Sequence, residues 1–315
     1  RRRRTSAGGA LERILAFLLL VFFLLFMLLA RLGAVVCRGH MAEHVRGSRA
    51  VVISAAIAPE NPEVAEAHRL NISVLPRAEL LAELMRVKYG IAIAGSHGKT
   101  TTTSMTAAVL HAAEKDPTVV VGGRVASLGS NARLGNSDFL LVEADESDGS
   151  FLQLTPIVAL VTSIDREHLD HYSSFEAVQD AFVEFANKVP FYGSAIVAID
   201  DPGARRILPR IRRRVRTYGF AADADLIASR VECGHMRSRF ELSYRGRELG
   251  KFSVRGVGEH NVLNATGAAL VGLELEISMD RIRLGLESFS GVERRFQVRG
   301  ERGGVTVIDD YGHHP

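Results

Sequence analysis

A short glycine-rich segment stands between an apolar run and a helical pattern. Ile91 to Ala94 is apolar and of strand length, Gly95-Ser96-His97-Gly98-Lys99-Thr100-Thr101 follows it, and a helical pattern continues to about Ala113. Backbone N–H groups in such a loop, with the positive end of the helix that it opens, form a concave anion site suited to a triphosphate. Lys99 is expected on the β and γ phosphates, and the Thr100 hydroxyl is placed to coordinate Mg²⁺.

The loop is shorter than the general phosphate-loop pattern, because Ile93 stands where a glycine is expected five residues before Gly98. Taken alone, it could be a chance glycine turn before a helix. The strand before it and the lysine-threonine pair favour the phosphate site over that reading.

Short apolar runs alternate with helical patterns from Arg31 onward, which is typical of α/β units with a largely parallel sheet. We expect a doubly wound, phosphate-loop-type α/β domain, preceded by the tail of a smaller α/β domain. Arg237 to Tyr244 and Glu248 to Val254 alternate in polarity and predict a small antiparallel sheet. The predicted parts are residues 1–31 (basic and apolar), 32–86 (N-terminal domain remnant), 87–300 (central ATP-binding domain) and 301–315 (start of a further domain).

Carboxylates follow the next predicted strand, Phe139 to Val142, in the run Glu143-Ala144-Asp145-Glu146-Ser147-Asp148. An open α/β sheet places its ligands at the carboxyl ends of its strands, and Mg²⁺ prefers hard oxygen ligands. We therefore favour Glu143 as a metal ligand over the alternative of a solvated acidic loop. The strand after that leads to His168, which could ligate a second cation, although a lone loop histidine is more often merely exposed.

Each of three further sets of polar residues has two possible interpretations. Asn261 and Asn264 lie at a predicted helix entrance, where asparagine is ordinarily a cap. Arg294 and Arg295 could be a solvated pair or could supply a guanidinium to phosphate. The stretch Arg205 to Arg216 holds seven arginines and no aromatic residue, which favours a solvated helix face over an RNA or membrane contact.

The first residues are unlike the rest of the chain. Arg1 to Arg4 precede an uncharged apolar run, Ile14 to Ala30, which is typical of a signal peptide or membrane anchor. The alternative is a wrong start site or a reading-frame error. The net charge of +3 does not argue for a nucleic-acid partner, and the two cysteines, Cys37 and Cys233, favour a reducing compartment.

An ordered set of segments resembles the Mur ligases of peptidoglycan synthesis, over roughly residues 32–315. The segments are Gly95 to Thr101, Glu143 to Asp148, His168 to Tyr172, Gly258 to Asn264, Gly291 to Gln297 and Asp309 to Pro315. Within the family they look most like the members that join L-alanine to UDP-N-acetylmuramate. As an ordered set, these motifs are highly specific.

The resemblance implies a cytoplasmic, ATP-dependent and Mg²⁺-dependent ligase with UDP-N-acetylmuramate and L-alanine as substrates. The substrate carboxylate would attack the γ-phosphate to give an acyl phosphate and ADP, and the amine of L-alanine would displace phosphate. The family roles carried over are Lys99 on the β and γ phosphates, Thr100 and Glu143 on one Mg²⁺, His168 on the second, Asn261 and Asn264 on adenine, Arg295 on phosphate, and Asp310 on ribose.

Some positions depart from the family pattern. Ser96 replaces the usual threonine, Ser163 the usual asparagine, and Glu167 an aspartate, all mild changes. Relatives that carbamylate a lysine would carry it where this chain has Val183 and Glu184, so no carbamate site is predicted.

The family's UDP-binding glycine-rich loop is not found before Leu32, and its C-terminal domain is not found after Pro315. Because the family pattern resumes directly after the apolar run, we favour an upstream sequence error over an anchor. Two alternatives stay open: a recycling ligase that attaches a preformed peptide to the same sugar, against which the acidic run argues, and a membrane-anchored nucleotide-binding module without ligase activity.

Overall fold

The computed structural model describes residues 34–54, 56–125, 130–234, 236–292, 297–302 and 305–310. The chain divides into two compact units, Arg1–Arg77 and Ala78–Pro315. The predicted domain boundaries stay predictions. Within the described residues, no helix is long and apolar enough to cross a membrane. The predicted apolar run Ile14 to Ala30 lies outside them.

The first unit contains a parallel pair of strands, β1 (Ala50–Ile53) and β2 (Ser73–Pro76), with the helix α2 (Pro62–Arg69) between them in sequence. A short 3-10 helix, η1 (Ala42–Val45), precedes β1. Asn61 begins α2 as its N-cap, since its side chain accepts a hydrogen bond from the Glu63 N–H at 2.9 Å. This strand, helix and strand agree with the α/β character expected for the region before the central domain.

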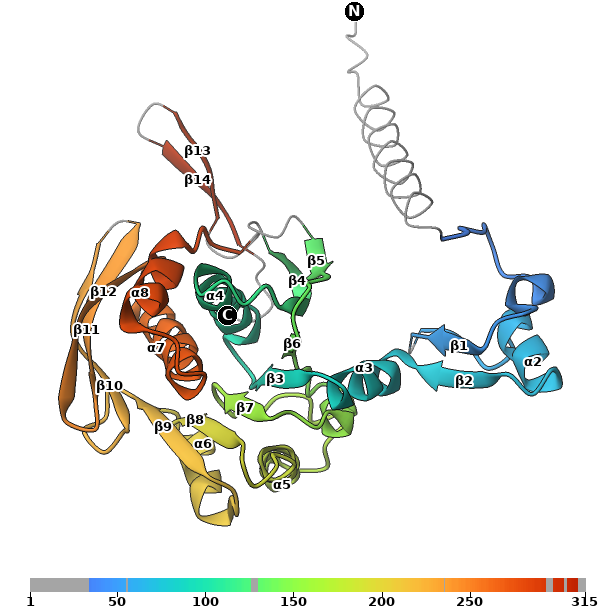
Figure 1. Ribbon diagram of the computed structural model, residues 1–315, viewed down its shortest axis with the longest axis horizontal. Helices are drawn as coiled ribbons and strands as arrows, with labels where there is room; N and C mark the ends of the chain where they lie inside the picture. The colour runs from blue at the N-terminus through green and yellow to red at the C-terminus, as the bar shows by residue number, and fades with distance from the viewer. Residues whose placement is uncertain are drawn as a thin grey trace, which may run out of the picture. The chain divides into compact units, whose positions relative to one another are not determined.

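The second unit is built on a ten-stranded sheet in the order β12-β11-β10-β9-β8-β7-β3-β6-β4-β5 (Figure 1). The strands from β9 to β4 in this order pair in parallel, β5 is antiparallel to β4, and β10 to β12 add an antiparallel part that joins the sheet through the parallel pair β9–β10. The strands are β3 (Tyr89–Ala94), β4 (Thr118–Val125), β5 (Ser130–Arg133), β6 (Phe139–Glu143), β7 (Val158–Val161), β8 (Ser194–Ala198), β9 (Val215–Gly219), β10 (Leu226–Cys233), β11 (Arg237–Tyr244) and β12 (Arg247–Arg255). A separate antiparallel pair is formed by β13 (Gln297–Arg302) and β14 (Val305–Asp309).

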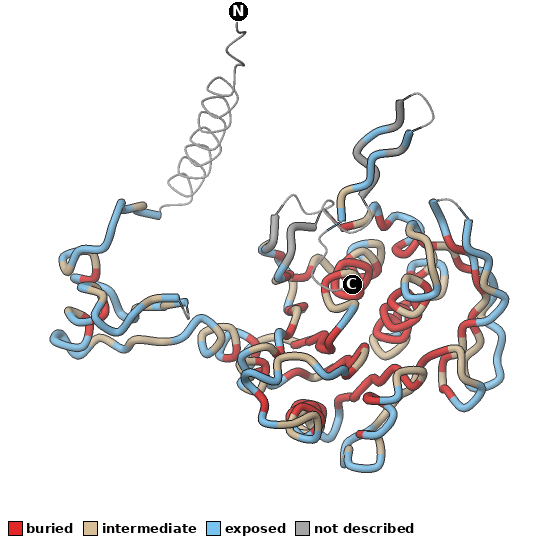
Figure 2. The backbone as a smooth tube through the Cα atoms, turned by 180° about the vertical axis from the view of Figure 1, so that it is seen from behind, coloured by how far each residue is buried: buried red, intermediate tan, exposed pale blue. Residues whose placement is uncertain are grey.

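Helices cover both faces of this sheet, so the predicted doubly wound α/β fold is confirmed. They are α3 (Arg77–Arg86), α4 (Lys99–Ala112), α5 (Phe175–Asn187), α6 (Pro202–Ile207), α7 (Glu259–Glu274) and α8 (Met279–Ser288). β3 serves both layers: Ile91 and Ile93 join the hydrophobic cluster that contains α4, α7 and α8, whereas Ala92 and Ala94 join the cluster that contains α5 and α6. Buried residues accordingly concentrate in the central strands and in the faces of the helices that pack on them (Figure 2).

Two expectations for this unit need correction. The predicted antiparallel strands are present, but they continue the central sheet, and β10 extends them by a strand that the alternation did not predict. The arginine-rich stretch is not one helix face: it runs through α6, a 3-10 turn at Leu208–Arg210, and β9. Long-range ion pairs explain the difference, because Arg214 and Arg216 both contact Glu274 of α7.

Candidate active site

The predicted strand, loop and helix are present around the phosphate loop. β3 ends at Ala94, the loop runs from Gly95 to Gly98, and α4 begins at Lys99. Because β3, β6 and β7 are adjacent and parallel, the segments that follow them meet at one edge of the sheet. That edge gathers most of the predicted site residues.

The loop glycines are required by close packing. Gly95 and Gly98 have φ values of 134° and 79°, and a Cβ would lie 2.1 Å from Thr162 Oγ1 at the first position and 2.5 Å from Asn264 Oδ1 at the second. Ser163 fixes the loop from the neighbouring strand end, since its carbonyl accepts from the Ser96 N–H at 2.9 Å and its hydroxyl accepts from the His97 N–H at 3.0 Å.

Thr100 and Glu143 are brought together as predicted. The Thr100 hydroxyl donates to Glu143 Oε1 at 2.8 Å, and Glu143 Oε2 accepts from the Gly122 N–H at 2.7 Å. The contact joins the first turn of α4 to the carboxyl end of β6, and β4 supplies the backbone donor. The two oxygens form a hard donor set of the kind that Mg²⁺ prefers.

Lys99 faces the same edge and contacts a residue that the sequence did not single out. Its ammonium group donates to the carbonyl oxygens of Gly95 at 2.7 Å and Ser96 at 3.3 Å, and to Glu146 Oε1 at 2.9 Å. Glu146 Oε2 lies at the same distance from Lys99 Nζ, although only Oε1 has hydrogen-bond geometry. Lys99 is therefore held by the loop and by one carboxylate of the acidic run.

Glu146 is buried, with a relative exposure of 1%, and burial raises the pKa of its carboxyl group although Lys99 acts in the opposite direction. Tyr172 donates its hydroxyl to the Glu146 carbonyl at 2.7 Å, and burial raises the pKa of Tyr172 to about 12. His168 Nε2 lies 3.8 Å from Glu146 Oε1. The predicted second cation ligand is therefore beside Glu146.

The residues fit a divalent cation on the evidence of their donor atoms. Within the described residues, Glu146, Glu167 and His168 each offer one donor atom, and these atoms lie within 4.8 Å of one another. His97, Asp165 and Glu167 form a second such group, which is more exposed. The first group combines a buried carboxylate with an imidazole next to the Thr100–Glu143 pair, so it suits a cation at the phosphates better.

The two asparagines behave differently from a capping pair. Gly258 is the N-cap of α7, so neither asparagine caps that helix. Asn264 is buried and accepts from the Thr102 hydroxyl at 3.1 Å, which places it against the start of α4. Asn261 lies in the first turn of α7, and its side-chain amide donates to the Val257 carbonyl at 2.9 Å.

Arg295 and Asp310 are the remaining predicted site residues. Arg295 lies outside the described residues, as does its neighbour Arg294. Asp310 follows β14 and is exposed. Their roles stay predictions.

Glu146 and Thr162 are the residues that sequence reasoning missed. Glu146 was visible as a member of the acidic run, three residues after Glu143, but only the fold shows that it is the buried one. Thr162 follows β7 and donates to the carbonyl oxygens of Ala94 at 3.2 Å and His97 at 2.5 Å, so it clamps the loop. A polar residue at a strand end was the available signal.

Comparison with protein families matches residues 93–272 to the Mur ligase middle domain. The chain belongs to the Mur ligase family. Residues 27–89 also match the profile described as "Mur ligase family, catalytic domain". The middle-domain match contains the phosphate loop, Glu143, Glu146, His168 and both asparagines, so the whole edge described above lies in a Mur ligase domain.

The chain is similar to UDP-N-acetylmuramate–L-alanine ligases from Solibacter usitatus and Sorangium cellulosum, at 60% and 57% identity over 91% of this chain. It spans 61% of the length of each of these relatives. Among solved structures, the UDP-N-acetylmuramate-alanine ligase from Thermotoga maritima matches with a TM-score of 0.76 and 26% identity, over 91% of this chain and 65% of that one. The predicted resemblance to Mur ligases is thus confirmed.

Proposed function

We propose that this Mur ligase chain belongs to a cytoplasmic enzyme that joins L-alanine to UDP-N-acetylmuramate. The chain would carry the site at which ATP activates the carboxylate of UDP-N-acetylmuramate for that joining. The observation that carries the proposal is the pairing of Lys99 and Thr100, the two side chains predicted to contact ATP and Mg²⁺, with the carboxylates Glu146 and Glu143 at the same sheet edge. Mur ligases are ATP-dependent, and the two relatives above share the alanine-adding name.

The reaction needs charge neutralisation and positioning rather than a covalent protein group. The carboxylate of UDP-N-acetylmuramate attacks the γ-phosphorus of ATP, and the bond to ADP breaks to leave an acyl phosphate. The amine of L-alanine then attacks the acyl carbon, loses a proton, and releases phosphate. Lys99 would exchange Glu146 for the β and γ phosphate oxygens, and the loop N–H groups at the start of α4 would bind the same anion.

Thr100 and Glu143 would hold one Mg²⁺, and His168 with Glu146 a second, to neutralise the phosphate charge during transfer. Glu146 is suited to this role because it is buried and lies between Lys99 and His168. When Lys99 turns to phosphate, the Glu146 carboxylate needs another positive partner. This arrangement of metal ligands includes no carbamylated lysine, since Val183 and Glu184 stand where some relatives carry it.

The test is phosphate release from ATP by the gene product that contains this chain, with UDP-N-acetylmuramate and each of L-alanine, glycine and L-serine. We expect release that depends on the sugar nucleotide and is fastest with L-alanine. Lys99→Met should lower kcat/KM by at least about a hundredfold, since it removes a charge contact to the transferring phosphate. No turnover with any of the amino acids, together with turnover on a preformed peptide, would replace this assignment with the recycling ligase.

A further inference from the structure

An exposed aromatic turn lies beside the arginine-rich stretch, far from the phosphate loop in the parallel sheet. Residues 188–193 connect α5 to the start of β8, whereas the phosphate loop follows the end of β3. Since these strands run in parallel, the turn lies at their amino ends and the phosphate loop at their carboxyl ends. Phe191 is 88% exposed and Tyr192 is 59% exposed.

Two consecutive arginines fix the ends of this connection. Arg213 Nε donates to the Asn187 carbonyl at 2.9 Å, and Arg214 Nε donates to the Gly193 carbonyl at 3.2 Å. The Gly193 N–H closes the turn on the Pro190 carbonyl at 2.9 Å. The aromatic side chains are therefore displayed on a braced turn rather than on a loose loop.

The stretch carries more positive charge than its neighbours neutralise. Of its seven arginines, Arg205, Arg210, Arg214 and Arg216 form ion pairs with carboxylates in the described part of the chain. Arg212 and Arg213 are exposed, and the Arg213 guanidinium donates to a carbonyl, which leaves its charge in place.

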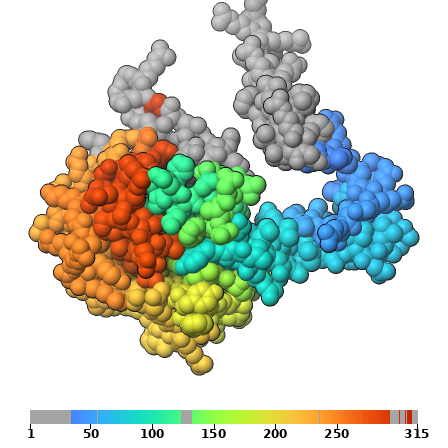
Figure 3. Space-filling model, in the orientation of Figure 1, coloured from blue at the N-terminus to red at the C-terminus, as the bar shows by residue number. Residues whose placement is uncertain are grey.

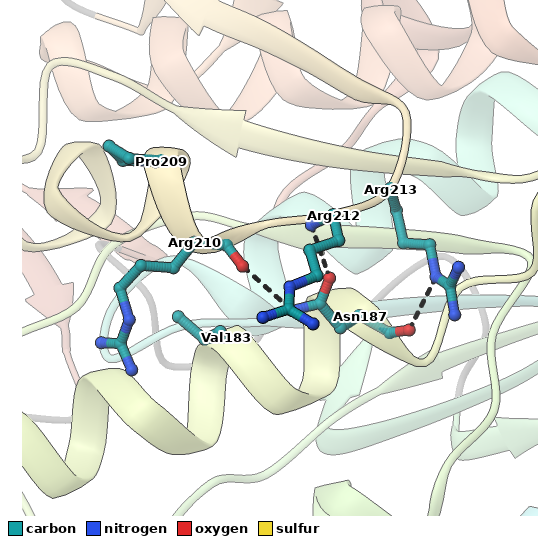
Figure 4. Close-up of a pocket in the computed structure, with 6 residues that line it drawn as sticks. All are labelled: Val183, Asn187, Pro209, Arg210, Arg212 and Arg213. Carbon is teal, nitrogen blue, oxygen red and sulfur yellow. Dashed lines mark hydrogen bonds between the residues drawn. The ribbon is translucent and has the colours of Figure 1, made fainter.

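The same two arginines line an open hollow beside the C-terminal end of α5 (Figure 4). Val183 and Asn187 of α5 form one side of it, and the segment from Pro209 to Arg213 forms the other. The Asn187 side chain holds this segment, because it accepts from the Arg212 backbone N–H at 2.7 Å and donates to the Arg210 carbonyl at 3.2 Å. The hollow is therefore a fixed basic surface.

We propose that Phe191, Tyr192, Arg212 and Arg213 form a peripheral binding site for an anionic lipid surface. Aromatic residues sit at the membrane interface, and arginines next to them are attracted by anionic headgroups. The two rings are edge to face, with an interplanar angle of 89° and a centroid distance of 5.2 Å, so they do not present parallel faces for stacking nucleobases. The chemistry fits insertion of a turn between headgroups.

The chain contains no tryptophan, so Phe191→Trp places a single fluorescent reporter in the turn. With vesicles that contain phosphatidylglycerol, its emission should move to shorter wavelength and be quenched by brominated acyl chains. Vesicles of phosphatidylcholine alone should give neither change. Adding Arg212→Gln and Arg213→Gln should weaken vesicle binding on the order of tenfold or more, and high salt should do the same.

Matched variants separate this site from other routes to a membrane. Leu284→Trp puts the reporter on an exposed residue of α8, and its emission should not change. Arg239→Gln with Arg255→Gln removes the same charge from exposed positions of β11 and β12, and should leave binding intact.

Vesicle binding with unshifted Phe191→Trp emission would assign binding to another segment and overturn the proposal. An equal emission shift with single-stranded RNA and no vesicles would overturn it in favour of a nucleic-acid site. Neither outcome bears on ligase activity.

Discussion

At the residue scale, two sets of acceptors compete for the ammonium group of Lys99. Glu146 and two loop carbonyls hold its ammonium group, and in the proposed function the same group must contact phosphate. The strength of the Lys99–Glu146 contact therefore subtracts from nucleotide affinity. Because Glu146 is buried and its pKa is raised, its charge is costly to leave without a cation.

Glu146→Gln should tighten ADP binding in buffer without divalent cations. The amide keeps the shape of the side chain but removes the charge that competes for Lys99 and repels phosphate. We expect a gain of about tenfold in affinity, or ~1.4 kcal/mol, from the loss of one charge-assisted contact. Calorimetric titration measures it, and in the presence of Mg²⁺ the gain should disappear or reverse if Glu146 binds the ion.

Asp145→Asn is the matched control for that change. Asp145 belongs to the same acidic run, is exposed, and accepts from the Ser147 N–H at 3.1 Å rather than from Lys99. Its replacement removes the same charge and should shift ADP affinity by much less, because exposed charges are screened. Equal effects of the two substitutions would mean that net charge, not the Lys99 contact, sets the affinity.

Glu63 makes the first unit sensitive to pH. Its carboxylate is bonded to His40 Nδ1 at 2.9 Å and to His44 Nδ1 at 2.6 Å, and the His40 hydrogen bond is the main cause that lowers the pKa of Glu63 below its ordinary value of 4.5. A lowered carboxyl pKa means that the stabilisation is present above 4.5 and is lost as pH falls through the lowered value. Acid should therefore loosen the contact between α2 and the segment around η1.

Glu63→Gln should speed hydrogen exchange in α2 at about pH 6, and the difference from the parent chain should fade by about pH 3. The loss should be less than about 1 kcal/mol, since both ion pairs are partly exposed to solvent. Exchange measured by mass spectrometry, with intrinsic rates corrected for pH, provides the comparison. A difference that grew toward low pH would contradict the direction of the pKa shift.

Helices α4 and α8 pack with almost no space between them at the element scale, and Figure 3 shows α8 on the surface of the second unit. A Cβ at Gly285 would lie 2.5 Å from Val109 Cα and 2.9 Å from the Ala108 carbonyl oxygen. These are backbone atoms of a helix that also carries the phosphate loop, so they cannot move aside cheaply. The glycine sets the distance between the two helices.

Gly285→Ala should lower the free energy of unfolding by ~1–3 kcal/mol, the usual cost of overpacking. The sign of this change is informative, because replacing glycine by alanine in an exposed helix interior would instead raise the free energy of unfolding by about 1 kcal/mol. Urea unfolding measures the change, and Glu287→Ala, at an exposed position of α8, should stay within ~0.5 kcal/mol of the parent. An increase in stability for Gly285→Ala would show that α8 can shift away from α4.

Elements whose signals are local could be predicted, and those fixed by distant partners could not. The signals of α5 are local, because its apolar residues recur at helical spacing and Ser174 caps it through the Ala177 N–H. β9 was missed because its arginines read as a solvated helix face until Glu274 of α7 is placed opposite them. The burial of Glu146 likewise depends on Tyr172, which lies 26 residues away in sequence. The meeting of the candidate site residues was therefore predictable from strand ends, whereas the choice among neighbouring carboxylates was not.

The whole second unit shares one sheet, and its site draws on the ends of β3, β6 and β7 together. A ligand that contacts Lys99, Glu143 and His168 should therefore stabilise the unit as a cooperative whole rather than one loop. With ADP and Mg²⁺ at about a hundred times the dissociation constant, mass action adds ~2.7 kcal/mol. For a unit of this size, that corresponds to a rise in Tm of about 5–10 °C.

Removing the metal with EDTA should abolish most of that rise, and Lys99→Met, compared with its own ligand-free Tm, should abolish it as well. The first unit provides an internal control, because β1, β2 and α2 supply none of the residues gathered at the site. Their hydrogen exchange should be unchanged by the nucleotide while β3, α4 and β6 become more protected. Equal protection in both units would mean that nucleotide binding is not carried by the second unit alone, and the site would then have to include residues before Ala78.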